Sequence, residues 1–263
     1  MTSSSDHLTP ASSSPAQVIA PESEGWAAVG VCFAVGMATR LWRPELGSRP
    51  ERMAAWAGLL HPATAMVASG GQCHGTTVAE IHGAGPSAGG TSQAMAQVHP
   101  ETDAFITREA GVALAVYTAD CVPVVLADPA TGWCGIAHCG WRGTLQGLAG
   151  RLAAALMRRG CEPGNLHAWV APAISGAVYE VSPEIIAQWH EAFPEFAPRV
   201  CCGRLLDLPH TCRLQLEAAG LQPARIEVSK ACTFSDPERF YSYRRDGSCG
   251  AHLITAIVRR PGA

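Results

Sequence analysis

The sequence predicts one α/β domain with a mixed sheet. Two continuous apolar runs of strand length, at residues 112–117 and 122–127, indicate strands that are buried on both faces in the centre of a sheet. Strand-length runs alternate with segments of helical periodicity. No linker divides them, so we expect one domain at residues 25–263 after a disordered, Ser- and Pro-rich tail at residues 1–24.

The other expected strands are short apolar runs bounded by Gly, Pro, Asn, Asp or Ser. A turn signal at residues 128–132 predicts a hairpin between two of them. Helices are expected where proline stands in the first turn, where serine can cap the start, or where glycine follows the end. In chain order, the expected strands are 30–37, 64–68, 78–81, 112–117, 122–127, 133–138, 167–170, 226–229 and 251–258. The expected helices are 49–60, 144–159, 183–192 and 207–219.

The composition limits the classes of partner and compartment. A net charge of -3 offers no basic surface for a phosphate backbone, so no nucleic-acid partner is expected. No apolar run approaches the ~20 residues of a membrane helix, so no membrane partner is expected. Residues 1–17 lack the pattern of a secretory signal. Eleven cysteines, an odd number, then predict mostly free thiols in a cytoplasmic protein.

Cysteine and histidine stand at the ends of expected strands. His74 follows one strand, Cys121 lies between two strands, and His138 ends another. One thiolate and two imidazoles suit zinc, and three protein ligands leave the open position of a catalytic site. A zinc ion there lowers the pKa of bound water to about 7. His74, Cys121 and His138 are therefore candidate metal ligands and candidate catalytic residues.

The same residues fit two other interpretations. Cys121 can be a nucleophile with His138 as its base and Asp120 as the orienting carboxylate, although His74 then has no role. Alternatively, Cys121 is a buried thiol and the two histidines are hydrogen-bonded residues near strand ends. The spacing by itself leaves these interpretations open.

Three further residues are candidates for ligand binding. The turn 140–143 places Arg142 at the start of an expected helix, where backbone N–H groups and a guanidinium can bind phosphate or carboxylate. An ion pair between Arg142 and an acidic neighbour is the alternative. In the segment 243–247, Arg244 is a better candidate to face a site than Arg245, which we expect to be a solvated charge. Tyr179 lies in a loop after a strand, where ligand contacts often arise.

Several short motifs follow one another along the chain. They are Gln72-x-His74-Gly75, Thr118-Ala119-Asp120-Cys121-x-Pro123, His138-x-Gly140-Trp141-Arg142-Gly143, Pro172-Ala173-Ile174, Tyr179-Glu180-Val181 and Ser242-Tyr243-Arg244-Arg245-Asp246-Gly247. With these motifs in this order, residues from about 60 to 257 resemble the purine nucleoside phosphorylase family of the laccase-domain type. Members of that family were formerly labelled multicopper polyphenol oxidoreductases.

The resemblance implies a fold and an activity. The fold would be a three-layer α/β/α sandwich with a mixed central sheet, shared with cysteine–histidine toxin deamidases. His74, Cys121 and His138 would hold Zn²⁺. The substrates would be purine nucleosides and phosphate: adenosine, inosine, guanosine and methylthioadenosine would undergo phosphorolysis, and adenosine would also be deaminated.

The chain departs from the family pattern in some segments. An Arg-x-Gly-Gly-x-Ser motif is replaced within residues 34–40, and an Asn-Arg pair on the first helix is replaced by residues 51–53. Cys73 and Cys139 are unusual neighbours of the two histidines, and we expect them outside the ligand set because adjacent strand side chains point apart. Three alternative functions therefore remain: a metal-free cysteine–histidine hydrolase or deamidase, an enzyme that edits cell-wall peptide precursors, and a non-catalytic nucleotide-binding relative.

Overall fold

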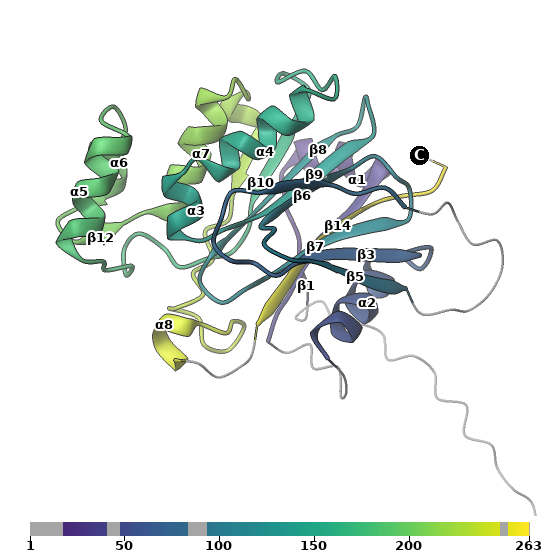
Figure 1. Ribbon diagram of the computed structural model, residues 1–263, viewed down its shortest axis with the longest axis horizontal. Helices are drawn as coiled ribbons and strands as arrows, with labels where there is room; N and C mark the ends of the chain where they lie inside the picture. The colour runs from purple at the N-terminus through teal and green to yellow at the C-terminus, as the bar shows by residue number, and fades with distance from the viewer. Residues whose placement is uncertain (1–17, 41–47, 84–93, 248–251, 263) are drawn as a thin grey trace, which may run out of the picture.

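The computed structural model describes residues 18–40, 48–83, 94–247 and 252–262. Within these ranges the strands form two mixed six-stranded sheets and a small hairpin (Figure 1). The first sheet has the order β1 (Val18–Ile19), β2 (Phe33–Ala38), β14 (Leu253–Arg259), β7 (Val112–Thr118), β3 (Met66–Gly70) and β5 (Met95–His99). The second has the order β13 (Ile226–Val228), β10 (His167–Val170), β8 (Val122–Asp128), β9 (Trp133–Cys139), β6 (Ala104–Thr107) and β4 (Val78–Glu80). The hairpin pairs β11 (Cys201–Cys202) with β12 (Leu205–Leu206).

Helices cover the outer faces of the two sheets. Helix α2 packs on the first sheet, whereas α4 and α7 pack on the second (Figure 1). The helices are α1 (Glu24–Cys32), α2 (Arg49–Leu60), α3 (Trp141–Leu145), α4 (Leu148–Met157), α5 (Pro183–Ala192), α6 (Ala197–Val200), α7 (Leu208–Ala218), the 3-10 turn η2 (Pro223–Arg225) and α8 (Tyr243–Asp246).

The α/β class with mixed strand pairing is confirmed, but the expected central sheet is two sheets packed face to face. The two apolar runs that suggested one sheet centre belong to different sheets, because β7 lies in the first and β8 in the second. In β8, Val125 faces the core between the sheets and Val124 faces the helices. Each run is therefore buried on both faces. A continuous apolar run indicates that a strand is buried on both faces, but it does not indicate which strands pair with it.

Several expected elements have the predicted bounds, and others differ. Helices α2 and α5 and strand β10 lie where the sequence predicts them. A capping box between Ser48 and Glu51 starts α2. The expected helix 144–159 is divided into α3 and α4, because the chain turns at Gly147 with φ of 80°. Most of the expected strand 30–37 is β2, but its first residues end helix α1.

Parts of the prediction fall outside the described residues. Residues 1–17 of the expected tail and Ala251 of the expected last strand are among them. Residues 18–24 include β1, which pairs with β2, and the start of α1. The backbone N–H groups of Glu22 and Ser23 donate to the Glu227 carboxylate. None of the helices in the described ranges combines the length and apolar character needed to cross a bilayer.

Candidate functional site

The chain crosses from one sheet to the other at residues 119–121. Strand β7 ends in the first sheet at Thr118, and β8 starts in the second at Val122. Asp120 has a φ of 93°, a conformation that is uncommon for a residue with a side chain. The tight crossing places Cys121 where the ends of both sheets meet.

The structure brings His74, Cys121 and His138 together. One potential ligand atom from each residue lies within 4.8 Å of those of the other two. The Sγ atom of Cys121 is 3.8 Å from His74 Nε2, and the two imidazole ring centroids are 4.9 Å apart. The turn after β3 supplies His74 and the end of β9 supplies His138. These are the three residues that the sequence singled out.

A buried carboxylate that the sequence analysis missed organises both histidines. Asp103 accepts hydrogen bonds from the backbone N–H groups of Cys73 and His74 at 3.1 Å and of Gly75 at 2.8 Å. Its Oδ1 atom also lies 2.8 Å from Nδ1 of His138. Asp103 thus fixes the turn that carries one histidine and the ring of the other. The bond to Nδ1 leaves Nε2 as the free ring nitrogen of His138, as in carboxylate–histidine–metal sites.

Asp103 takes the place that the nucleophile interpretation gave to Asp120. Burial alone raises the pKa of the Asp103 carboxyl, but the hydrogen bonds from His138, Gly75 and Cys73 outweigh burial and hold the pKa at about 2. The carboxylate is therefore ionised at neutral pH. The only sequence signal for this role is an aspartate directly before an apolar strand, β6, which was itself not predicted.

Cys121 and His138 each shift the pKa of the other. Burial raises the pKa of the Cys121 thiol, but the charge of His138 and hydrogen bonds from His138 and His74 lower it to about 6. Burial lowers the pKa of the His138 imidazole, but the Cys121 thiolate and the Asp103 carboxylate raise it to about 9. At neutral pH the metal-free site is thus a thiolate–imidazolium pair. A metal ion would displace the imidazolium proton on binding.

The donor set fits a metal ion that prefers sulfur and nitrogen. One thiolate and two imidazole nitrogens are typical of zinc sites with an open fourth position. Gly140 leaves room for them, because a Cβ atom there would lie 2.4 Å from His74 Cδ2 and 3.3 Å from Cys121 Sγ. The neighbouring thiols lie elsewhere: Cys139 points into the core beneath α4 and α7, and Cys73 Sγ is 3.2 Å from Asp103 Oδ2.

The three residues line a cavity of about 590 Å³, a volume typical of small-molecule sites. Arg142, Arg244 and Tyr179, the other residues selected from the sequence, also line it. The guanidinium of Arg244 lies over the Tyr179 ring, 4.9 Å from its centroid, and donates to the carbonyl oxygen of Glu180. Both segments therefore form one wall of the cavity.

Arg142 lies beside an aromatic ring and not beside a carboxylate. Its guanidinium is 4.2 Å from the Trp141 ring centroid, and no ion pair among the described residues includes it. Helix α3 has only 5 residues, so its dipole adds little to anion binding. Any anion contact here would depend mainly on the guanidinium.

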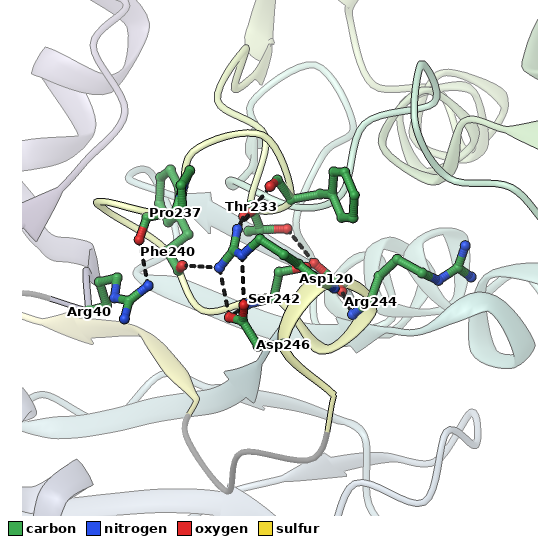
Figure 2. A network of polar contacts seen from close by, with 10 residues as sticks. Arg40, Asp120, Thr233, Pro237, Phe240, Ser242, Arg244 and Asp246 are labelled. Atoms are coloured by element: carbon green, nitrogen blue, oxygen red, sulfur yellow. Dashed lines mark hydrogen bonds and ion pairs between the residues drawn. The ribbon is translucent and has the colours of Figure 1, made fainter.

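Asp120 anchors the segment that carries Arg244 (Figure 2). Its carboxylate accepts hydrogen bonds from Thr233 Oγ1 at 2.6 Å, from Ser242 Oγ at 3.0 Å and from the backbone N–H of Arg244 at 2.7 Å. Asp120 is therefore a positioning residue for the rim of the cavity.

Arg245 is not the solvated charge that the sequence suggested. Its guanidinium donates to the carbonyl oxygens of Thr233, Phe234 and Phe240, each at 2.8 Å, and pairs with Asp246. The pair 244–245 lies in the short helix α8, so one arginine faces the cavity while its neighbour supports the segment from behind.

An α/β fold with a sulfur and nitrogen donor group in a cavity of this volume defines a class: proteins with a small-molecule site able to hold a metal ion. The chain belongs to the family described as multi-copper polyphenol oxidoreductase laccase, whose model matches residues 35–260.

Its relatives carry a different functional name. The chain is 33% identical over 224 residues to "Purine nucleoside phosphorylase YlmD" of Geobacillus stearothermophilus, covering 83% of this chain and 80% of that protein. It is 35% identical over 206 residues to "Purine nucleoside phosphorylase ORF3" of Streptomyces griseus, covering 78% of each. The crystal structure of YlmD from Geobacillus stearothermophilus aligns with a TM-score of 0.75 and 28% identity, over 90% of this chain and 94% of that one.

Proposed function

We propose that the chain is a zinc-dependent purine nucleoside phosphorylase that acts on adenosine, inosine, guanosine and methylthioadenosine and also deaminates adenosine. The observation that carries the proposal is the meeting of His74, Cys121 and His138 in a cavity of about 590 Å³. The names of relatives at 33% and 35% identity support purine nucleosides and phosphate as substrates.

In this proposal Cys121, His74 and His138 are the zinc ligands and touch the reacting groups. Bound zinc would supply an activated water and a Lewis acid. The chain contributes the deprotonated thiol of Cys121 and the fixed ring of His138, whose Nδ1 is held by Asp103. Asp103 also fixes the backbone on both sides of His74, so the ligands are arranged before the ion binds.

The cavity wall would bind the substrates. Phosphorolysis requires an anion held close to the anomeric carbon of the ribose, and we assign this contact to Arg142 because its guanidinium faces the cavity without a carboxylate partner among the described residues. Tyr179 and Arg244, which stack on one another, would contact the nucleoside. The ring can pack on a base, while the guanidinium can donate to polar groups.

Two measurements on purified protein test the proposal together. Zinc content should approach one ion per chain, and hypoxanthine should be released from inosine only when phosphate is present. Arg142→Ala should raise the phosphate concentration needed for half-maximal rate and leave the zinc content unchanged. Stoichiometric zinc without release of base from any of the four nucleosides would favour a non-catalytic relative instead.

The thiolate–imidazolium pair favours a second candidate, a metal-free cysteine–histidine hydrolase or deamidase. With a pKa near 6, Cys121 would be a nucleophile at neutral pH. The two candidates differ in their response to alkylation by iodoacetamide. Zinc should protect Cys121 in the phosphorylase, and a chelator should remove this protection. Equal alkylation of metal-loaded and chelated protein would support the hydrolase, whose substrate can include a peptide amide.

We further propose that residues 25–263 form one domain and that the protein works in the cytoplasm. The ten described cysteines are free thiols, which suits a reducing compartment.

A further inference from the structure

The cavity carries an excess of positive charge. Three arginines line it: Arg49, Arg142 and Arg244. Among the described lining residues, Asp120 is the only carboxylate, and its two oxygens already accept three hydrogen bonds from the segment 233–244. Guanidinium groups that face a cavity without carboxylates to pair with favour an anionic ligand.

Arg49 lines the cavity from the helix that packs on the first sheet, whereas Arg142 follows strand β9 of the second sheet. Arg49 is the first residue of α2, the helix on the outer face of the first sheet. Its guanidinium lies over the ring of Tyr117, 5.0 Å from the centroid. The Tyr117 hydroxyl donates to the Arg49 carbonyl oxygen, which ties the start of α2 to β7. Backbone and side chain of Arg49 are thus both held by one tyrosine.

His252 completes the arrangement from the start of β14. Its Nε2 atom is 3.3 Å from Nη2 of Arg49. Because arginine has no acceptor, Nε2 of the imidazole is the acceptor in this hydrogen bond. The bond uses one of the five N–H donors of a guanidinium. The orientation of Arg49 is therefore fixed while donors remain for a ligand in the cavity.

We propose that Arg49, oriented by Tyr117 and His252, binds a phosphate group on the first-sheet side of the cavity. The choice of phosphate rests on the proposed function, because a phosphorylase must bind that anion. Two sources share this chemistry: inorganic phosphate as co-substrate, and the 5′-phosphate of a nucleoside monophosphate in place of a free nucleoside. The assignment adds to the contact proposed for Arg142 and brings in residues that lie 203 positions apart in the chain.

Equilibrium binding tests the proposal without requiring turnover. Calorimetric titrations of the zinc-loaded protein would use inorganic phosphate alone, inosine alone and inosine 5′-monophosphate alone. Each is repeated with Arg49→Gln, and with Arg199→Gln as a matched control, since Arg199 is an exposed arginine in α6 outside the cavity. Loss of a charged donor should weaken phosphate-group binding by about 10- to 100-fold.

The outcomes separate the two sources. Weaker binding of inorganic phosphate by Arg49→Gln alone would identify the co-substrate. Unchanged phosphate binding, with the affinity for inosine 5′-monophosphate reduced to that for inosine, would identify the 5′-phosphate. Equal affinities of all three proteins for all three ligands would overturn the proposal. None of these three results depends on phosphorolysis, so a failure of the proposed activity would be seen separately.

A second measurement uses the unsubstituted protein and therefore does not depend on the folding of a variant. Phenylglyoxal modifies accessible arginines, and peptide mapping locates the modified residues. Inorganic phosphate or inosine 5′-monophosphate should slow modification of Arg49 and leave that of Arg199 unchanged. If neither ligand protects Arg49 at concentrations that saturate the protein, Arg49 does not bind the phosphate group.

Discussion

Two buried carboxylates, Asp103 and Asp120, serve the same site in different ways. Asp103 bonds to residues 28 to 35 positions away, namely the turn 73–75 and His138. Asp120 bonds to Thr233, Ser242 and Arg244, which are 113 to 124 positions away. The first carboxylate arranges the donor group. The second holds the segment 233–244 at the rim of the cavity, and Figure 2 shows this second network.

The two carboxylates support two different parts of one site, the donor group for a metal ion and the cavity wall for a substrate. The donor group depends on contacts among neighbouring strand ends, so it should tolerate changes in the segment 233–246. The cavity wall depends on long-range hydrogen bonds to Asp120, so it can change without loss of the metal site. Substitution of Asp103 should therefore affect mainly metal binding, and substitution of Asp120 should affect mainly substrate binding.

The largest effect is expected for Cys121→Ala. This substitution removes the only sulfur donor of the group, so zinc content should fall to background and phosphorolysis should be lost. Metal analysis and an inosine assay would measure both. Full zinc occupancy in this variant would show that Cys121 is not a ligand.

A smaller but clear loss of metal is expected for Asp103→Asn. Neutralising the partner of His138 Nδ1 should weaken zinc binding by about 10- to 100-fold, as for other residues that orient a ligand. Competition with a chromophoric chelator would give the affinity. Asp128→Asn is a matched control, because Asp128 is an equally buried carboxylate that accepts from the backbone N–H groups of Ala130 and Thr131 in a turn outside the site.

For Asp120→Asn we expect a change in substrate binding without a change in metal. Asparagine has one acceptor oxygen where the carboxylate has two, and it is uncharged, so the three hydrogen bonds to this position should weaken, the rim should loosen and KM for inosine should rise by about 10-fold or more. Zinc content and kcat should change much less. A fall in kcat with an unchanged KM would contradict a positioning role.

The smallest effect is expected for Thr233→Val. It removes one of the three donors to the Asp120 carboxylate and leaves the other two, and a hydrogen bond to a carboxylate contributes about 1.5–3 kcal/mol to stability. KM should rise by less than about 10-fold because Ser242 and Arg244 still donate to Asp120, and the free energy of unfolding should fall by about 1.5–3 kcal/mol. Denaturant titration and steady-state kinetics would measure the two quantities. An effect as large as that of Asp120→Asn would mean that Thr233, and not the carboxylate, holds the segment.

Several helices and strands could be predicted from the sequence because short sequence patterns determine where such elements begin and end. Proline in the first turn marked α2 and α5, and the turn 128–132 marked the β8–β9 hairpin. Strands β5 and β6 were missed: β5 is mostly exposed and mixes polar with apolar residues, and β6 is only 4 residues long. The division into two sheets was missed because an apolar run reports burial on both faces without naming what covers them.

The sequence by itself determined the α/β class and pointed to His74, Cys121 and His138, since reactive side chains at strand ends can be recognised one segment at a time. Only the tertiary structure decided which side chains complete the site. Asp103 became the partner of His138 because the pairing of β6 with β9 brings them together. Arg49 joined the cavity because α2 and β14 meet at one end of the first sheet. Contacts between segments far apart in the chain depend on strand order, which no local pattern specifies.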